Sequence, residues 1–245
     1  MKLKVMKFGG TSLANDDTIT HAIKKIMKQV QDGYRVLVVV SAMGREGACY
    51  ATDTLLQLLQ GKVSVQERDR LMSVGETISS IVLSARLNSL GLNSYALGNE
   101  ENGLISDTEY GQASIIKTEH TKIKELLQLY DVIIAPGFQA HTEDYHITTL
   151  GRGGSDYSAM LYAVMLGLDE VFIYTDVDGV YNADPKVFPD AVRYEIISYD
   201  ELISFIQRGD RVMQLQSLYY AKQYRLKICI GSTTEEYDGT WVIAR

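Results

Sequence analysis

The sequence has 245 residues, of which 46% are hydrophobic and only three are proline, and this composition excludes a largely disordered chain. The formal net charge of −7 argues against nucleic acid or an anionic membrane as the main partner. The amino terminus lacks the apolar segment of a secretory signal, and the longest aliphatic run, VLVVV, is far shorter than the roughly 20 residues that span a bilayer. A cytoplasmic, soluble, single domain is therefore expected.

The first third of the chain predicts a strand, a helix and a second strand. LKVMKF, residues 3–8, is the first strand, and it ends at two glycines. A helix follows, because apolar residues recur with a period near 3.6: Ile19, Ala22, Ile23, Ile26, Met27 and Val30. Gly33 ends that helix. RVLVVVSAMG, residues 35–44, then reads as a strand that is covered on both faces of a parallel sheet.

The remainder continues the alternation of helices and strands. A long helix that ends before Gly91 is marked by Leu71, Val74, Ile78, Val82 and Ala85. Three further buried strands are predicted in DVIIAPG (131–137), EVFIYTDVDG (170–179) and LKICIGS (226–232). This pattern predicts an α/β fold, a three-layer sandwich with an open, mainly parallel β-sheet.

Four loops of small residues directly follow predicted strands: FGGTS at 8–12, SAMG at 41–44, APGFQ at 135–139 and TDVDG at 175–179. Parallel strands would bring these loops to one edge of the sheet, where ligands of such folds bind. Glycine suits tight turns in general, but glycine N–H groups beside helix amino termini also suit phosphate. Neither GxxxxGK[ST] nor a complete GxGxxG is present.

No protein metal site is predicted. The four histidines lack HExxH spacing and are expected on the surface or in loops, and the two cysteines lack CxxC spacing.

Five ordered segments carry a family resemblance: KFGGTS, VVVSAMG, SVGE, TTLGRGGSD and TDVDGVYNADPK. Over its whole length the sequence resembles the catalytic domain of aspartate kinases, within the amino-acid kinase superfamily. The resemblance implies transfer of the γ-phosphoryl group of ATP to the side-chain carboxylate of L-aspartate. The product would be 4-phospho-L-aspartate, on the route to lysine, threonine and methionine. The resemblance also implies a Mg²⁺ ion that is held mainly by the ATP phosphates, and it suggests a homodimer.

The resemblance assigns roles to residues on the acceptor side, expected in a substrate-binding lobe over about 1–165. Lys7 would neutralise charge on the β- and γ-phosphates, and Asp156, which alone would pass for a helix cap, would orient Lys7. Arg152 matches the α-carboxylate through two parallel hydrogen bonds, and Glu76 would lie near the substrate ammonium group. The resemblance places the hydroxyls of Ser41 and Thr52 around the substrate and the phosphate. The hydroxyl of Ser155 either donates a hydrogen bond to the substrate or has a structural role.

On the nucleotide side, expected over about 166–245, the resemblance assigns phosphate contacts to the Gly9 and Gly10 backbone and to Lys186. The segment 175–186 resembles TDVxGxYxxDPR and implies nucleotide contacts from Thr175, Asp176 and Tyr181. The largest departure is RGDRVMQ, residues 208–214, where Arg211 replaces a lysine expected at the ATP phosphates.

Two alternatives stay open: a paralogous kinase for another amino or carboxylic acid, and a catalytically silent regulatory or binding subunit, which the RGDRVMQ departure motivates. The family commonly continues into ACT-type regulatory domains, and the sequence stops near that junction, so no ACT domain and no feedback inhibition by lysine or threonine are expected of this chain alone.

Overall fold

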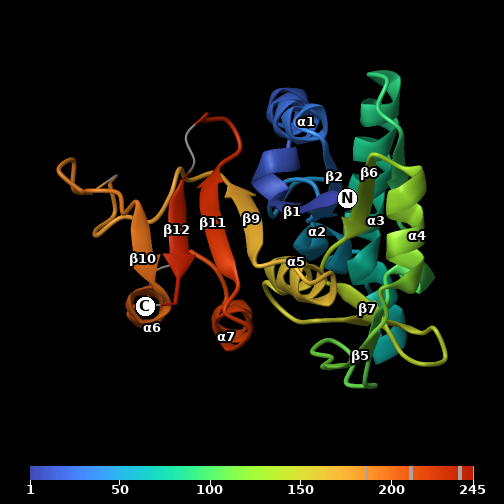
Figure 1. Cartoon of the computed structure of the whole chain (residues 1–245). Coiled ribbons are helices and arrows are strands. Elements are labelled where there is room, and N and C mark those ends of the chain that lie inside the picture. The colour runs from blue at the N-terminus through green and yellow to red at the C-terminus, as the bar shows by residue number, and fades with distance from the viewer. Residues whose placement is uncertain (186, 210–211, 237–238, 245) are drawn as a thin grey trace.

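The computed structural model describes residues 1–185, 187–209, 212–236 and 239–244. Its main sheet runs across the molecule in Figure 1 and has eight strands. In spatial order they are β10 (Ile196–Ser198), β12 (Thr240–Ile243), β11 (Lys227–Ser232), β9 (Glu170–Thr175), β1 (Lys2–Phe8), β2 (Tyr34–Val40), β6 (Val132–Pro136) and β3 (Ser94–Ala96).

Helices cover both faces of this sheet, so the predicted three-layer α/β fold is confirmed (Figure 1). Alternate residues of β2 enter two separate cores: Val38 packs with α1 (Asp16–Gln31) and the end of α3 (Val65–Ser89). Leu37 and Val39 belong instead to the core on the opposite face. The helices that contribute to this core are α4 (Thr121–Leu129), α5 (Gly154–Met165), α6 (Tyr199–Gln207) and α7 (Leu215–Gln223). Among the described strands of this sheet, only the β11–β12 pair is antiparallel.

A second, four-stranded sheet was not predicted. Its order is β5 (Ile115–Thr118), β4 (Leu104–Ser106), β7 (Gln139–His141) and β8 (Ile147–Thr149). The expectation that every histidine lies at the surface or in a loop is wrong for His141, which ends β7 and is only 4% exposed. The short helices are η1 (Gly10–Leu13), α2 (Thr52–Leu56) and η2 (Asn99–Glu101).

The long helix α3 presents a polar face to the interior. The predicted helix is confirmed, and a capping box at Ser64 begins it. Its apolar residues Val74 and Ile81 are nevertheless 39% and 57% exposed, while Asp69 and Glu76 are buried. The buried side of α3 therefore carries carboxylates and small side chains toward the interior. None of the described helices is long and apolar enough to cross a membrane.

The four small-residue loops meet at one edge of the main sheet, as predicted. A Cβ on Gly10 would lie 2.3 Å from the carbonyl oxygen of Gly44, whose own N–H donates to the Gly10 carbonyl at 2.9 Å. The N–H of Gly9 donates to Tyr174 at the end of β9, and that of Gly137 donates to the last carbonyl of β2. Direct contacts between backbones therefore join the ends of β1, β2, β6 and β9. At position 10 only glycine permits such a contact.

Candidate functional site

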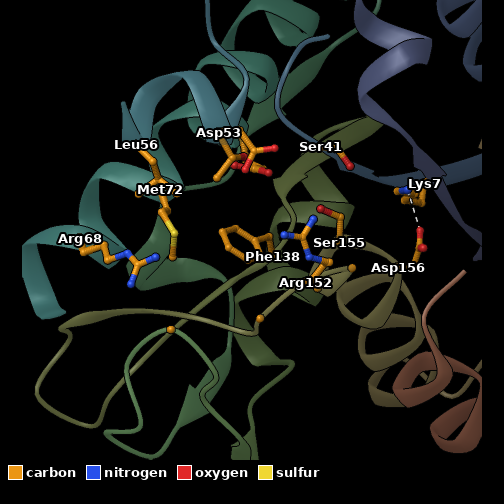
Figure 2. Close-up of a pocket in the computed structure, with 16 residues that line it drawn as sticks. Lys7, Ser41, Asp53, Leu56, Arg68, Met72, Phe138, Arg152, Ser155 and Asp156 are labelled. Atoms are coloured by element: carbon orange, nitrogen blue, oxygen red, sulfur yellow. Dashed lines mark ion pairs between the residues drawn. The ribbon is translucent and has the colours of Figure 1, made fainter. Parts of the chain in front are cut away.

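A cavity of about 460 Å³ opens at this edge (Figure 2). The loops and helices around it come from distant parts of the sequence, yet every residue predicted for catalysis or acceptor binding lines it: Lys7, Ser41, Thr52, Glu76, Arg152, Ser155 and Asp156. In Figure 2 the pair formed by Lys7 and Asp156 lies at one end of the cavity, and Arg68 lies at the other. The structure thus brings the predicted acceptor-side residues together in one place.

Lys7 and Asp156 form an ion pair with 2.6 Å between Nζ and Oδ1, drawn as a dashed line in Figure 2. Lys7 is a residue of the interior strand β1, and Asp156 lies in the first turn of α5. The two side chains are only 10% and 13% exposed, so little water screens the pair. The arrangement fixes one cation at the carboxyl end of a strand that is paired on both sides.

Glu76 is a buried carboxylate without a full set of partners. The residue is 3% exposed, and its Oε2 has no hydrogen-bond partner among the described residues. Burial raises the pKa of Glu76 to about 8, although hydrogen bonds from backbone groups, Ala42 among them, and the charge of Lys7 oppose the shift. A cationic hydrogen-bond donor in the cavity would satisfy this oxygen and favour the ionised form.

Gly75 directly precedes Glu76 on α3. It lets this helix approach the loop that follows β2. A Cβ on Gly75 would lie 2.6 Å from the carbonyl oxygen of Tyr50 and 2.7 Å from the Cβ of Ala42. The absence of a side chain at this position therefore brings Glu76 within reach of the Ala42 backbone and of the cavity.

Arg152 is presented by a sharply turning loop. Gly151 and Gly153, on either side of it, both have φ of +75°, a conformation that favours glycine. A Cβ on Gly153 would lie 1.8 Å from Cγ of Gln214, so the side chain of Gln214 occupies that space. Arg152 is exposed and has no ion-pair partner within the described ranges. A guanidinium in this position is available to an anion in the cavity.

A second cavity of about 640 Å³ adjoins the first and shares Arg152, Gly153 and Asp156 with it. It extends toward α6 and α7, where Gly209 and Gln214 line it. Four described residues of the RGDRVMQ segment line the second cavity: Gly209, Val212, Met213 and Gln214. Lys186 and Arg211, both predicted at the nucleotide phosphates, lie outside the described residues.

The other predicted nucleotide contacts do not line either cavity. Asp176 pairs with Arg45 at 2.7 Å and accepts a hydrogen bond from the Thr175 hydroxyl. The hydroxyl of Tyr181 donates to the carboxylate of Asp178 at 2.9 Å. The N–H of Gly9 is already bonded to Tyr174, as described above, whereas Gly10 borders a smaller cavity of about 180 Å³ that Arg45 also lines.

Several lining residues were missed by sequence reasoning: Asp53, Leu56, Arg68, Met72 and Phe138. Phe138 lies in the APGFQ loop, which was noted for its small residues, but its φ of +71° was not anticipated. The N–H of Phe138 donates to the hydroxyl of Ser158 at 3.0 Å, which helps to hold this strained backbone. The described side chains include no group of three or more His, Cys, Asp and Glu arranged to hold a metal ion.

Comparison with known proteins places the chain in a family. The model of the amino acid kinase family matches residues 2–232. Aspartokinase 1 of Bacillus subtilis is 38% identical over 245 residues, which is 99% of this chain and 61% of that protein. The crystal structure of aspartate kinase from Synechocystis superposes with a TM-score of 0.86 at 32% identity and covers 99% of this chain and 40% of that one.

A third relative agrees in fold. E. coli aspartokinase III, solved in complex with aspartate and ADP, has a TM-score of 0.79 at 24% identity, and the match covers 100% of this chain and 65% of that one. The chain spans about 60% of the length of the curated relatives that it matches. The family match, the sheet order and the cavity at the strand ends agree, and the chain belongs to the amino acid kinase family.

Proposed function

We propose that this chain is the catalytic part of an ATP-dependent aspartate kinase. It would transfer the γ-phosphoryl group of ATP to the side-chain carboxylate of L-aspartate and release ADP and 4-phospho-L-aspartate. The observation that carries the proposal is the buried, incompletely bonded carboxylate of Glu76 in one cavity with Arg152 and Lys7. The similarity to aspartokinases of Bacillus subtilis and Synechocystis supports it.

Glu76 and Arg152 together suit an α-amino acid. The ammonium group of the acceptor would bind the free oxygen of Glu76, and the α-carboxylate would bind the guanidinium of Arg152 through paired hydrogen bonds. The hydroxyls of Ser41, Thr52 and Ser155, which line the same cavity, would donate to acceptor or phosphate oxygens. These contacts would leave the side-chain carboxylate of the acceptor to face Lys7.

The chemistry requires no general base. An aspartate side chain, with an ordinary pKa near 3.9, is already ionised at neutral pH and attacks the γ-phosphorus directly. As the bond to the β-phosphate oxygen breaks, Lys7 would neutralise the charge that develops on the phosphates, and Asp156 would hold Lys7 in place. Mg²⁺ would be bound mainly by ATP oxygens and would supply further charge neutralisation.

The nucleotide would occupy the 640 Å³ cavity on the side of residues 166–245, next to the acceptor cavity. A nucleoside contact from Asp176 would require this carboxylate to exchange its present bond to Arg45. We also infer a cytoplasmic location for this protein. The resemblance to aspartate kinases suggests a homodimer.

A hydroxamate assay for acyl phosphate, run with ATP and a panel of acids, tests the proposal. We expect product from aspartate and none from glutamate. Glu76→Gln should raise KM for aspartate at least tenfold, because the ammonium group loses a charged partner. Glu125→Gln, a matched change at an exposed position of α4, should leave KM unchanged. Product from glutamate alone would indicate a paralogous kinase, and no product from any acid would indicate a silent subunit.

A further inference from the structure

Asp69 is a buried carboxylate that the proposed chemistry does not use. It lies on α3, seven residues before Glu76 and so on the same side of the helix, and is only 1% exposed. Its Oδ2 accepts the N–H of Thr149 at 2.7 Å and the N–H of Gly111 at 2.9 Å. No lysine or arginine among the described residues forms an ion pair with it. Two backbone donors therefore compensate its burial.

The two donors belong to segments that border the acceptor cavity. Thr149 is the last residue of β8 and stands three positions before Arg152. Gly111 itself lines the cavity, and its carbonyl oxygen would lie 3.6 Å from a Cβ on Gly151. One carboxylate oxygen thus joins the helix of Glu76 to both the loop that carries Arg152 and the loop that supports it.

The Arg152 loop needs such an attachment. Glycines with φ of +75° stand on either side of Arg152, and glycine restricts the backbone least of all residues. The loop is also fixed at its start by backbone hydrogen bonds. The N–H of Leu150 donates to the carbonyl of Phe138 at 2.8 Å, and the carbonyl of Thr149 accepts the N–H of Ala113 at 2.9 Å. Asp69 adds a side-chain attachment to these backbone bonds. It does so from α3, the helix that also carries Glu76, the other predicted partner of the acceptor.

We propose that Asp69 is a positioning residue that sets the distance between Arg152 and Glu76, and thereby the binding of the acceptor amino acid. This inference rests on the proposed function. A purely structural contact at this place has less need of a buried polar side chain, since burying a polar group is costly and apolar packing often stabilises as well. Hydrogen bonds from two N–H groups to one side-chain oxygen are instead directional, which suits the placement of a loop.

Steady-state kinetics on three variants test the proposal. Asp69→Ala should lower kcat/KM for aspartate by about 30- to 100-fold, mostly through a higher KM, because misplacement of a binding group such as Arg152 lowers kcat/KM by about this factor. KM for ATP should change less than about twofold. Asp69→Asn should stay within about fivefold of the parent, since a single amide oxygen can accept both N–H groups. Ser84→Ala removes a buried 3.0 Å bond from α3 to Ser94, away from the cavity, and should change neither KM.

Hydrogen exchange read by mass spectrometry gives a result independent of activity. In Asp69→Ala the peptides that cover 108–114 and 149–155 should exchange at least tenfold faster, and in Ser84→Ala they should not. If Asp69→Ala does not fold, Asp69→Glu replaces it, because the longer side chain keeps the charge and displaces the oxygen. Unchanged exchange in these peptides, or equal losses for aspartate and ATP, overturns the proposal. A parent protein that forms no product from aspartate refutes the proposed function instead, and exchange still decides whether Asp69 fixes the loop.

Discussion

The raised pKa of Glu76 makes the proposed binding of aspartate depend on pH in a way that can be calculated. Burial raises this pKa to about 8 in the ligand-free protein, so the carboxyl group is mostly neutral at pH 7. The proposed contact with the substrate ammonium group requires the ionised form. Binding must therefore remove the proton, and its free energy includes the cost of ionising Glu76 at the working pH.

The size of the effect follows from the ionised fraction. With a pKa of about 8, Glu76 is ionised to about 9% at pH 7, about 50% at pH 8 and about 90% at pH 9. The dissociation constant for aspartate should therefore fall nearly tenfold from pH 6 to pH 7 and about fivefold from pH 7 to pH 8, and change less than twofold from pH 8 to pH 9. Binding at pH 7 should release about 0.9 proton per site.

Isothermal titration calorimetry measures both quantities. Titrations of aspartate at pH 7 in buffers with different ionisation enthalpies give the number of protons released, and a series from pH 6 to pH 9 gives the affinity profile. The variant Glu76→Gln should bind weakly at every pH and release almost no proton. A parent protein whose affinity is flat between pH 6 and pH 8, or which takes up protons on binding, would refute the role assigned to Glu76.

Three further outcomes are expected. The pKa of Glu76 in the folded protein lies above its ordinary value of 4.5, so the ligand-free protein should lose stability as pH rises from 4.5 to about 8. The variant Glu76→Gln should therefore have a higher Tm than the parent at pH 8 but not at pH 4.5. Equal Tm differences at both pH values would contradict this reasoning. Lys7→Ala should lower kcat about 100-fold or more in the hydroxamate assay while circular dichroism stays unchanged, and normal turnover would show that the phosphates bind elsewhere. Gly10→Ala should cost about 1 to 3 kcal/mol in denaturant unfolding, because its Cβ would meet the Gly44 carbonyl at 2.3 Å, whereas Gly9→Ala, with 3.6 Å to the nearest atom, should cost less; equal costs would contradict the close approach.

The main sheet and the meeting of the small-residue loops at its edge could be predicted because their signals are local or ordered along the chain. The β-branched run of β2 and the periodic helix α1 depend on neighbouring residues, and the glycine loops follow from the ends of parallel strands. Glu76 could be placed in the cavity only through the family resemblance, because a glutamate within a helix has no distinguishing local signal. Its raised pKa depends on burial, which a sequence does not specify.

The small sheet and the nucleotide side were harder to predict. Strands β4, β7 and β8 have three residues each, too few to show an alternating pattern, so this sheet was missed entirely. On the nucleotide side the resemblance named Asp176 and Tyr181 as contacts. In the structure Asp176 forms an ion pair with Arg45, and the hydroxyl of Tyr181 donates to Asp178. The first pair joins two loops that are distant in the sequence, and the second forms within one loop. No local propensity fixes the conformations of these loops.

The place of Lys7 in the sheet has a consequence for how the specificity of the proposed enzyme can change. β1 is bonded to β2 along its whole length and to β9 at its carboxyl end, so the backbone under Lys7 is held by main-chain bonds that do not depend on side-chain identity. The groups that would recognise the acceptor come instead from a helix and from loops. In the proposed enzyme, new acceptors could therefore be selected by redesigning those surrounding segments, while the point at which phosphate charge would be neutralised stays anchored.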